Sequence, residues 1–296
     1  MTTFQSLSDD MAAAVERAGQ SLVAVYARAH TPGTGIVWSA DGYILTADHV
    51  VQADEDIKVA LPDGTLVAAT IAGRDPANDL ALLKAEASGL TPAEWLPLSA
   101  LKVGQLVLAV GRPGRSEISA TLGTISAIGQ PQTDRRRLDA YVQTDVLMYP
   151  GFSGGPLVAP GGKVAGLNSS ALSRGASLAL PWETVNAVAI ALKEHGRVPR
   201  GFLGIGSNPV RLAKSVAETL GQRVGLLVQS VEPGSPAEHG GLLQGDILVG
   251  LGGIAVEGPD DLQAALRPET VGQPMTVKVV RGGEIKELTV TVGERK

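Results

Sequence analysis

Residues 151–157 read GFSGGPL, a serine with glycines on both sides. Glycine reaches backbone conformations that are closed to other residues, so this stretch predicts a tight turn that exposes the Ser153 hydroxyl. In such a turn, the backbone N–H groups of Gly151 and Ser153 can point at one spot, as a tetrahedral oxyanion requires. The stretch therefore predicts a nucleophilic Ser153, with these two amides as oxyanion donors.

A serine is a weak nucleophile and needs a base, for which the chain offers four histidines. His195 ends a predicted helix and His239 precedes two glycines, so a capping or turn role accounts for both. His30 lies in a polar stretch. His49 follows the apolar run 43–45, where a strand can hold it rigidly while it faces a cleft. We therefore expect His49 to be the base.

The base in turn needs an acceptor that fixes its tautomer. Asp79 opens the apolar run 80–83, which predicts a buried strand that anchors the carboxylate. The order His49, Asp79, Ser153 is that of the chymotrypsin type.

A lipase or esterase is the rival class, because residues 151–155 also match the Gly-x-Ser-x-Gly elbow of α/β-hydrolases. That elbow needs a helix directly after the serine and the order serine, acid, histidine. Gly154, Gly155 and Pro156 oppose a helix. The candidate acid and histidine both precede Ser153, so this reading is disfavoured.

Short apolar runs separated by turn residues surround these candidates. Such a pattern over residues 20–180 favours two antiparallel β-barrels. The predicted strands are residues 22–26, 35–38, 43–46, 57–61, 66–71, 80–83, 105–110, 118–128, 140–144, 156–158, 163–168 and 177–180.

Apolar residues recur at helical spacing before and after these strands. Residues 1–20 predict a short amphipathic helix, and residues 182–195 predict a second helix that ends at Gly196. A linker follows, and residues after 200 mix strand and helix patterns in a small α+β unit. We expect a protease domain over residues 1–198, with the helical extension at 1–20, and a second domain over 199–296.

Composition bounds the function classes. The chain has 296 residues, 44% of them hydrophobic, a net charge of -5 and no cysteine. A mildly acidic chain is a poor nucleic-acid binder, so we expect no nucleic-acid partner. The cluster Arg135, Arg136, Arg137 predicts a solvated loop.

The N-terminus lacks the basic start and unbroken apolar stretch of a signal peptide. Apolar runs also fall short of the roughly 20 residues that a membrane helix needs. The chain as written is expected in the cytoplasm, or in the periplasm if the N-terminus was trimmed.

Together these stretches resemble the HtrA (Deg) family of trypsin-like proteases with a C-terminal PDZ domain. The matching stretches are DGYILT at 41–46, HVV at 49–51, DLALLK at 79–84, QTD at 143–145, PG at 150–151, SGGPLV at 153–158, LALP at 178–181, GFLGI at 201–205, PGSPA at 233–237, GL at 241–242 and GDIL at 245–248. Each is weak alone, but their order and spacing are specific.

The resemblance implies a mainly β fold: a chymotrypsin-like double β-barrel followed by a small α+β PDZ domain. It implies His49, Asp79 and Ser153 as triad, with the Gly151 and Ser153 amides as oxyanion hole. It implies ATP-independent degradation of unfolded or misfolded proteins by a homotrimer, without cofactor or metal. It implies a regulatory loop at residues 135–137. It also implies a PDZ groove for peptide C-termini, formed by Phe202, Leu203, Gly204, Ile205, Leu262, Ala265 and Leu266.

Two residues depart from the family pattern. The family usually has Asn where Phe152 precedes the nucleophile, and Asp48 places a carboxylate directly before the base.

In chymotrypsin-type sites the pocket floor lies about six residues before the nucleophile, here at Leu147. The opposite wall is expected from residues 166–171, among them Gly166, Leu167, Asn168 and Ser169. Because no acid sits at the floor, we expect cleavage after small or medium aliphatic residues. The alternative function is a latent protease that acts mainly as a chaperone or peptide-binding scaffold.

Overall fold

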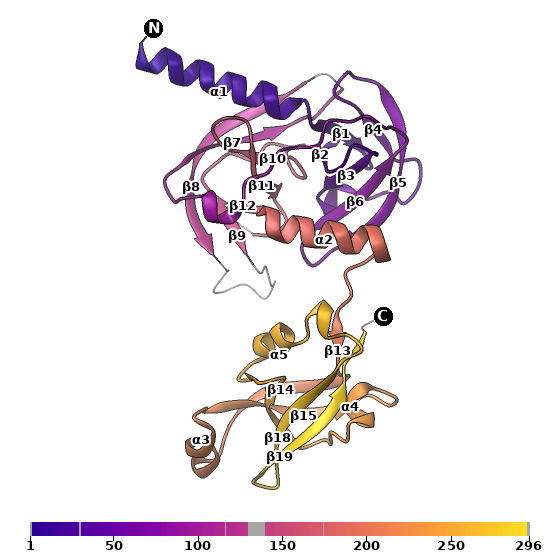
Figure 1. Ribbon diagram of the computed structural model, residues 1–296, viewed down its shortest axis with the longest axis vertical. Helices are drawn as coiled ribbons and strands as arrows, with labels where there is room; N and C mark the ends of the chain where they lie inside the picture. The colour runs from indigo at the N-terminus through magenta and orange to yellow at the C-terminus, as the bar shows by residue number, and fades with distance from the viewer. Residues whose placement is uncertain (1, 30, 116, 130–139, 174, 295–296) are drawn as a thin grey trace. The chain divides into compact units, whose positions relative to one another are not determined.

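The structure is a computed structural model that describes residues 2–29, 31–115, 117–129, 140–173 and 175–294. The chain divides into two compact units, Met1–Val198 and Pro199–Lys296. Each unit has its own buried core. Figure 1 shows β-structure dominating the first unit and a smaller sheet with short helices in the second.

The first barrel is built from short, apolar and largely buried strands. Strand β1, for example, reads LVAVY, and β-branched residues of this kind pack well in a sheet. The strands pair antiparallel in the closed order β1-β2-β3-β6-β5-β4. Their bounds are β1 Leu22–Tyr26, β2 Gly33–Val37, β3 Tyr43–Thr46, β4 Lys58–Ala60, β5 Leu66–Asp75 and β6 Leu80–Ala85. A short 3-10 turn, η1 (Asp48–Val50), follows β3 and carries His49.

The second barrel closes in the order β10-β11-β12-β9-β8-β7. Its strands are β7 Leu106–Gly111, β8 Ser119–Gly129, β9 Tyr141–Thr144, β10 Pro156–Val158, β11 Val164–Ser169 and β12 Ser177–Leu180; the turn η2 (Leu98–Ala100) precedes it. The predicted chymotrypsin-like double barrel is thus confirmed. The cluster Arg135, Arg136, Arg137 lies outside the described residues.

Side chains of both barrels meet in one shared core with helix α2 (Trp182–His195). Leu45 and Leu82 of the first barrel join Leu167 and Leu180 of the second in this cluster. Helix α2 adds the buried face that its spacing predicts, and it ends at Gly196, whose φ of 72° is left-handed. The strands next to the three predicted triad residues, β3, β6 and β10, each place a side chain in this shared core.

Helix α1 (Thr3–Gly19) matches the predicted N-terminal helix. Thr2 caps it, since its hydroxyl accepts a hydrogen bond from the Gln5 N–H at 3.2 Å. Only the C-terminal part is anchored: Ala14 and Ala18 are buried in the shared core, whereas Phe4 and Leu7 are exposed. Among the described residues, no helix combines the length and apolar character needed to cross a membrane.

The second unit is the α+β domain that the sequence predicts. Its main sheet has the order β14-β15-β16-β18-β19, with β17 beside β16, and β13 pairs with β20. The strands are β13 Gly201–Phe202, β14 Ile205–Arg211, β15 Val224–Val231, β16 Ile247–Leu251, β17 Ile254–Ala255, β18 Pro274–Arg281, β19 Glu284–Thr291 and β20 Gly293–Glu294. The helical segments are α3 Lys214–Leu220, α4 Pro236–His239, α5 Pro259–Ala265 and η3 Pro268–Thr270.

Candidate active site

The loop before Ser153 forms a tight turn. The Phe152 N–H donates to the Tyr149 carbonyl at 3.0 Å, and Gly151 has a φ of 93°. Proline at the second position and a left-handed glycine at the third are the residues of a type II turn, as Pro150 and Gly151 are here. A further left-handed glycine follows the serine: a Cβ on Gly154 would lie 2.2 Å from the Thr34 carbonyl oxygen. The glycine pattern therefore follows from steric need.

Thr34, a fully buried residue of β2, ties this loop to the first barrel. Its hydroxyl donates to the Gly151 carbonyl at 2.6 Å and accepts from the Arg112 N–H at 2.7 Å. Its own N–H donates to the Ser153 carbonyl at 3.1 Å. The loop is thus held by hydrogen bonds from a strand more than a hundred residues away in the sequence.

The Gly151 and Ser153 N–H groups remain open. Within the part of the chain that the structure describes, neither donates a hydrogen bond to another residue. Since neither N–H has an acceptor among the described residues, both are available to a negatively charged oxygen.

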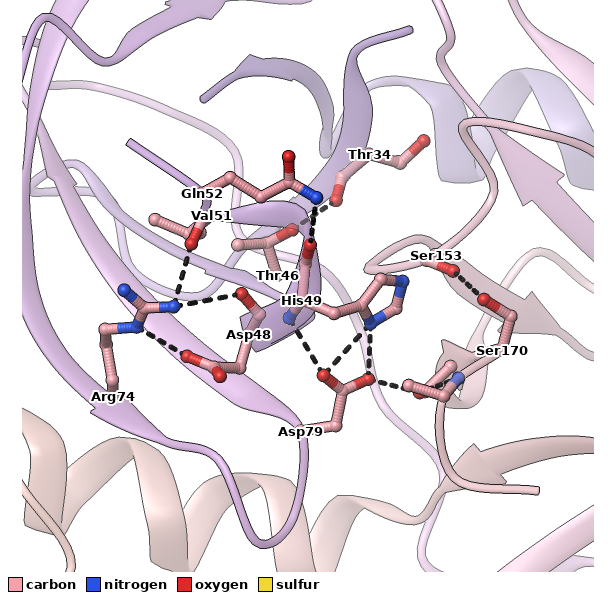
Figure 2. Close-up of polar contacts among 12 residues, drawn as sticks. Thr34, Thr46, Asp48, His49, Val51, Gln52, Arg74, Asp79, Ser153 and Ser170 are labelled. Atoms are coloured by element: carbon pink, nitrogen blue, oxygen red, sulfur yellow. Dashed lines mark hydrogen bonds and ion pairs between the residues drawn. The ribbon is translucent and has the colours of Figure 1, made fainter. Parts of the chain in front are cut away.

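His49 and Asp79 are directly bonded (Figure 2). His49 Nδ1 lies 2.8 Å from Asp79 Oδ2 and 3.0 Å from Oδ1, and the His49 backbone N–H donates to Oδ1 at 2.9 Å. An ionised carboxylate only accepts hydrogen bonds, so the proton sits on Nδ1 and Nε2 is left as the acceptor. This is the tautomer that a general base requires.

Asp79 is held in an unusual backbone conformation. Its φ is 51°, a left-handed value that aspartate tolerates better than most residues. Its carbonyl accepts the Asp48 N–H at 3.1 Å, and its Oδ2 also accepts a hydrogen bond from the Ser169 hydroxyl. Bonds on both carboxylate oxygens fix the acid beneath the imidazole.

Ser153 lies on the other side of the His49 ring, whose Nε2 edge faces the serine in Figure 2. The Ser153 side chain is buried, and its Oγ lies 2.9 Å from Ser170 Oγ. The structure thus brings the three predicted residues together, with the serine hydroxyl bonded to Ser170.

The carboxylate of Asp48, next to His49, is paired with Arg74. Arg74 Nε donates to Asp48 Oδ1 at 2.6 Å, and its Nη2 donates to the Val51 carbonyl at 2.8 Å. The guanidinium therefore spans the turn that carries His49 and neutralises the buried carboxylate.

Phe152 fills the position where the family usually has Asn. The ring is fully buried in the core of the second barrel and lies edge-on to Tyr149, with ring centroids 5.8 Å apart. A Cβ on Gly111 would come within 2.5 Å of this ring. Phe152 therefore anchors the loop by packing, and its side chain points away from solvent.

Leu147, the predicted pocket floor, faces solvent in this structure. Leu147 is 64% exposed, whereas Val146 before it is buried in the second barrel's core. The alternation of side chains along an extended segment turns Leu147 outward.

Four residues predicted to form the opposite wall are not accessible in this structure, because all four lie buried within β11: Gly166, Leu167, Asn168 and Ser169. Leu167 packs in the shared core. The Asn168 backbone bonds the nucleophile loop, accepting from the Gly154 N–H at 2.9 Å. Ser169 was expected to line the pocket; its hydroxyl instead serves Asp79.

In the second unit, the predicted groove residues come from two segments, 202–205 at β13 and the start of β14, and 262–266 at the end of α5. Gly204 has a φ of 81°, and a Cβ there would lie 2.3 Å from Ser235 Cβ. The carbonyls of Leu203 and Gly204 are bound by the N–H groups of Ala237 and Glu232. The predicted side chains Leu203, Leu262, Ala265 and Leu266 are buried together in the domain core, and Ile205 packs against them; Phe202 lies in β13.

Sequence reasoning missed Thr34 and Arg74 as contacts of the site. Neither carries a motif of its own, because their roles arise from distant contacts. Ser170 lies inside the predicted wall, but its contact with Ser153 was not predicted.

Family models and relatives match both units. A trypsin-like peptidase domain matches residues 33–167 and a PDZ domain matches residues 201–292. A probable periplasmic serine endoprotease, DegP-like, of Ectopseudomonas mendocina is 39% identical over 275 residues, which make up 90% of this chain and 57% of the relative. Its counterpart in Chlamydia pneumoniae is 35% identical over 267 residues, with 88% and 55% covered. The chain thus spans somewhat more than half the length of these relatives.

Solved structures match along nearly their whole length. The HtrA-type protease AlgW with a decapeptide has a TM-score of 0.82 and 30% identity, covering 96% of this chain and 98% of that one. The serine endoprotease from Yersinia pestis has a TM-score of 0.77 and 30% identity, with 96% and 97% covered. With its double barrel and PDZ domain, the chain belongs to the HtrA (Deg) family of trypsin-like serine proteases.

Proposed function

We propose that this chain is a serine endopeptidase in which Ser153 is the nucleophile, His49 the general base and Asp79 the orienting acid. The observation that carries the proposal is the bond between His49 Nδ1 and Asp79 Oδ2, at 2.8 Å, with Nε2 turned toward Ser153. A buried carboxylate in this place holds the imidazole in the productive tautomer and stabilises the imidazolium that forms during attack.

The proposed reaction is acyl transfer. His49 Nε2 takes the Ser153 proton as the oxygen attacks the peptide carbonyl, and the oxyanion is bound by the Gly151 and Ser153 amides. The imidazolium then gives its proton to the leaving amine. Water, activated by the same nitrogen, hydrolyses the acyl-enzyme and releases the second product.

We further propose unfolded or misfolded proteins as substrates, without ATP, and peptide C-termini as ligands of the PDZ domain. Support comes from the DegP-like relatives and from the solved AlgW structures, which hold a decapeptide or a tripeptide. A peptide C-terminus would add as a strand beside β14. The segment 146–148, where the pocket is expected, carries no acidic residue, in keeping with cleavage after aliphatic residues.

A homotrimer and a periplasmic location complete the proposal. The expectation of a cytoplasmic protein finds no support, since the relatives are named periplasmic. Light scattering after size exclusion tests the trimer, and fractionation of cells that express the full-length gene tests the location.

The decisive experiment is covalent labelling with a fluorophosphonate probe. The wild-type chain is expected to be labelled at Ser153 and to cleave an unfolded protein faster than the same protein folded. Ser153→Ala is expected to lose both activities and to keep peptide binding. Undiminished labelling of Ser153→Ala would overturn the assignment, whereas chaperone activity without any labelling would favour the scaffold alternative.

A further inference from the structure

Two consecutive serines, Ser169 at the end of β11 and Ser170 directly after it, contact opposite ends of the site. The Ser169 hydroxyl donates to Asp79 Oδ2, and Ser170 Oγ lies 2.9 Å from Ser153 Oγ (Figure 2). Ser169 is fully buried, whereas Ser170 is exposed. The first serine therefore supports the acid from within the fold, and the second touches the reacting oxygen from the solvent side.

The bond to Ser170 competes with the bond that catalysis needs. In the described part of the chain, the Ser153 hydroxyl is hydrogen-bonded to Ser170, and no hydrogen bond joins it to His49. A general base must lie within about 2.6–3.2 Å of the oxygen whose proton it takes. Because Ser153 Oγ is bonded to Ser170 and not to His49, the Ser153 hydroxyl must shift toward Nε2 before His49 can receive its proton.

We propose that Ser170 holds the nucleophile in a resting position, so that breaking the Ser153–Ser170 hydrogen bond precedes attack. The inference rests on the proposed role of Ser153. Only hydrogen bonds are exchanged in this step. Whichever serine donates in the resting bond, the Ser153 O–H comes to donate to His49 Nε2, and the exposed Ser170 hydroxyl bonds water instead. No covalent bond changes, and no proton leaves either serine.

The size of the effect follows from the bond that is lost. A hydrogen bond between neutral hydroxyls contributes modestly, so its removal is expected to speed acylation about three- to tenfold. Because Ser170 is exposed, Ser170→Ala leaves no buried polar group without a partner and should not alter the unfolding midpoint.

The test measures the second-order rate of fluorophosphonate labelling for the full chain. Ser170→Ala is expected to react faster than wild type. Ser170→Thr keeps a hydroxyl and is expected to react more slowly than Ser170→Ala. Ser173→Ala, in the same loop, is the matched control and should equal wild type. With a peptide substrate, Ser170→Ala should raise kcat and leave KM unchanged if acylation limits turnover.

A rate for Ser170→Ala equal to or below that of wild type would overturn the inference, because Ser170 would then be neutral or helpful. That outcome is distinct from failure of the proposed function, which would appear as labelling that survives Ser153→Ala. A crystal structure of Ser170→Ala supplies an independent readout. There, Ser153 Oγ is expected within about 3 Å of His49 Nε2; an unmoved hydroxyl would also contradict the proposal.

Discussion

Arg74 Nε lies 2.6 Å from Asp48 Oδ1, and the same guanidinium donates a hydrogen bond to the Val51 carbonyl. One side chain therefore bridges the turn that contains His49. Asp48 is buried and stands next to the base. A buried carboxylate is tolerated when it is paired and hydrogen-bonded. The pair therefore explains how this chain accommodates an acid directly before His49, the proposed base.

Replacing Arg74 by Met should loosen this turn. The change strands the Asp48 carboxylate and is expected to lower the free energy of unfolding by about 1–3 kcal/mol, with a parallel loss of kcat/KM. Adding Asp48→Asn should recover part of both losses, since an amide needs no counter-charge. Denaturant unfolding and peptide kinetics check the cycle; purely additive effects would show that the two residues are not coupled.

Removing the Thr34 hydroxyl should disturb the loop before Ser153, which carries the proposed oxyanion donors Gly151 and Ser153. Thr34→Val has nearly the same shape but leaves the Gly151 carbonyl and the Arg112 N–H without their buried partner. We expect a loss of about 1–3 kcal/mol in stability and a lower kcat with little change in KM. Thr34→Ser retains the hydroxyl and should keep most of the activity. Equal kinetics for the Val and Ser variants would argue against this role.

Asp79→Asn should preserve the structure and abolish most of the catalysis. Asparagine tolerates the left-handed φ of 51°, but its amide can donate to Nδ1 and so favour the wrong tautomer. The expected fall in kcat is about 10⁴-fold, the size seen for this change in a chymotrypsin-type triad. Asp63→Asn, an exposed turn residue of the same barrel, is the control for a generic charge effect.

Phe152→Ala should be among the most destabilising changes in the second barrel. A fully buried phenylalanine leaves a cavity when truncated, at a cost of about 3–5 kcal/mol. Phe152→Leu refills part of that space and should cost less. Urea unfolding with tyrosine and tryptophan fluorescence measures both; similar midpoints for the Ala variant and wild type would contradict the packing role.

In the PDZ domain, Asp246 should make stability dependent on pH. Burial raises the pKa of this carboxyl, but the hydrogen bonds from Arg281 and the Leu243 N–H, together with the charges of Arg281 and Lys286, outweigh it and bring the pKa below 3.8. A folded pKa below the unfolded value means that the stabilisation is complete above the unfolded value. It is lost as the pH falls from about 4 toward the folded pKa.

Hydrogen exchange of the full chain checks this prediction at strands β16 and β18. Protection there should fall as the medium is acidified below about pH 4, and Asp246→Asn should be less protected at neutral pH, by about 1.5–3 kcal/mol. If acidification lowers protection as much in Asp246→Asn as in wild type, another group is responsible.

Local sequence patterns were enough to predict the double barrel, the second α+β domain and the segments that carry His49, Asp79 and Ser153. These features depend on local sequence. Backbone conformation can be predicted directly from alternating apolar runs, helical spacing and a glycine-flanked serine. The buried face of α2 and its end at Gly196 followed from the same local rules.

Tertiary structure alone decided which groups complete the site. Thr34 acts through contacts with segments far apart in the chain, Arg74 through its bond to Asp48 and Ser170 through its bond to Ser153. No motif or spacing predicts these partners. The exposure of Leu147 and the turning of Ser169 to Asp79 likewise depend on how each strand end is oriented in the barrel. Strand periodicity predicts that a residue is buried or exposed, but the partner it meets is set only when the barrels close.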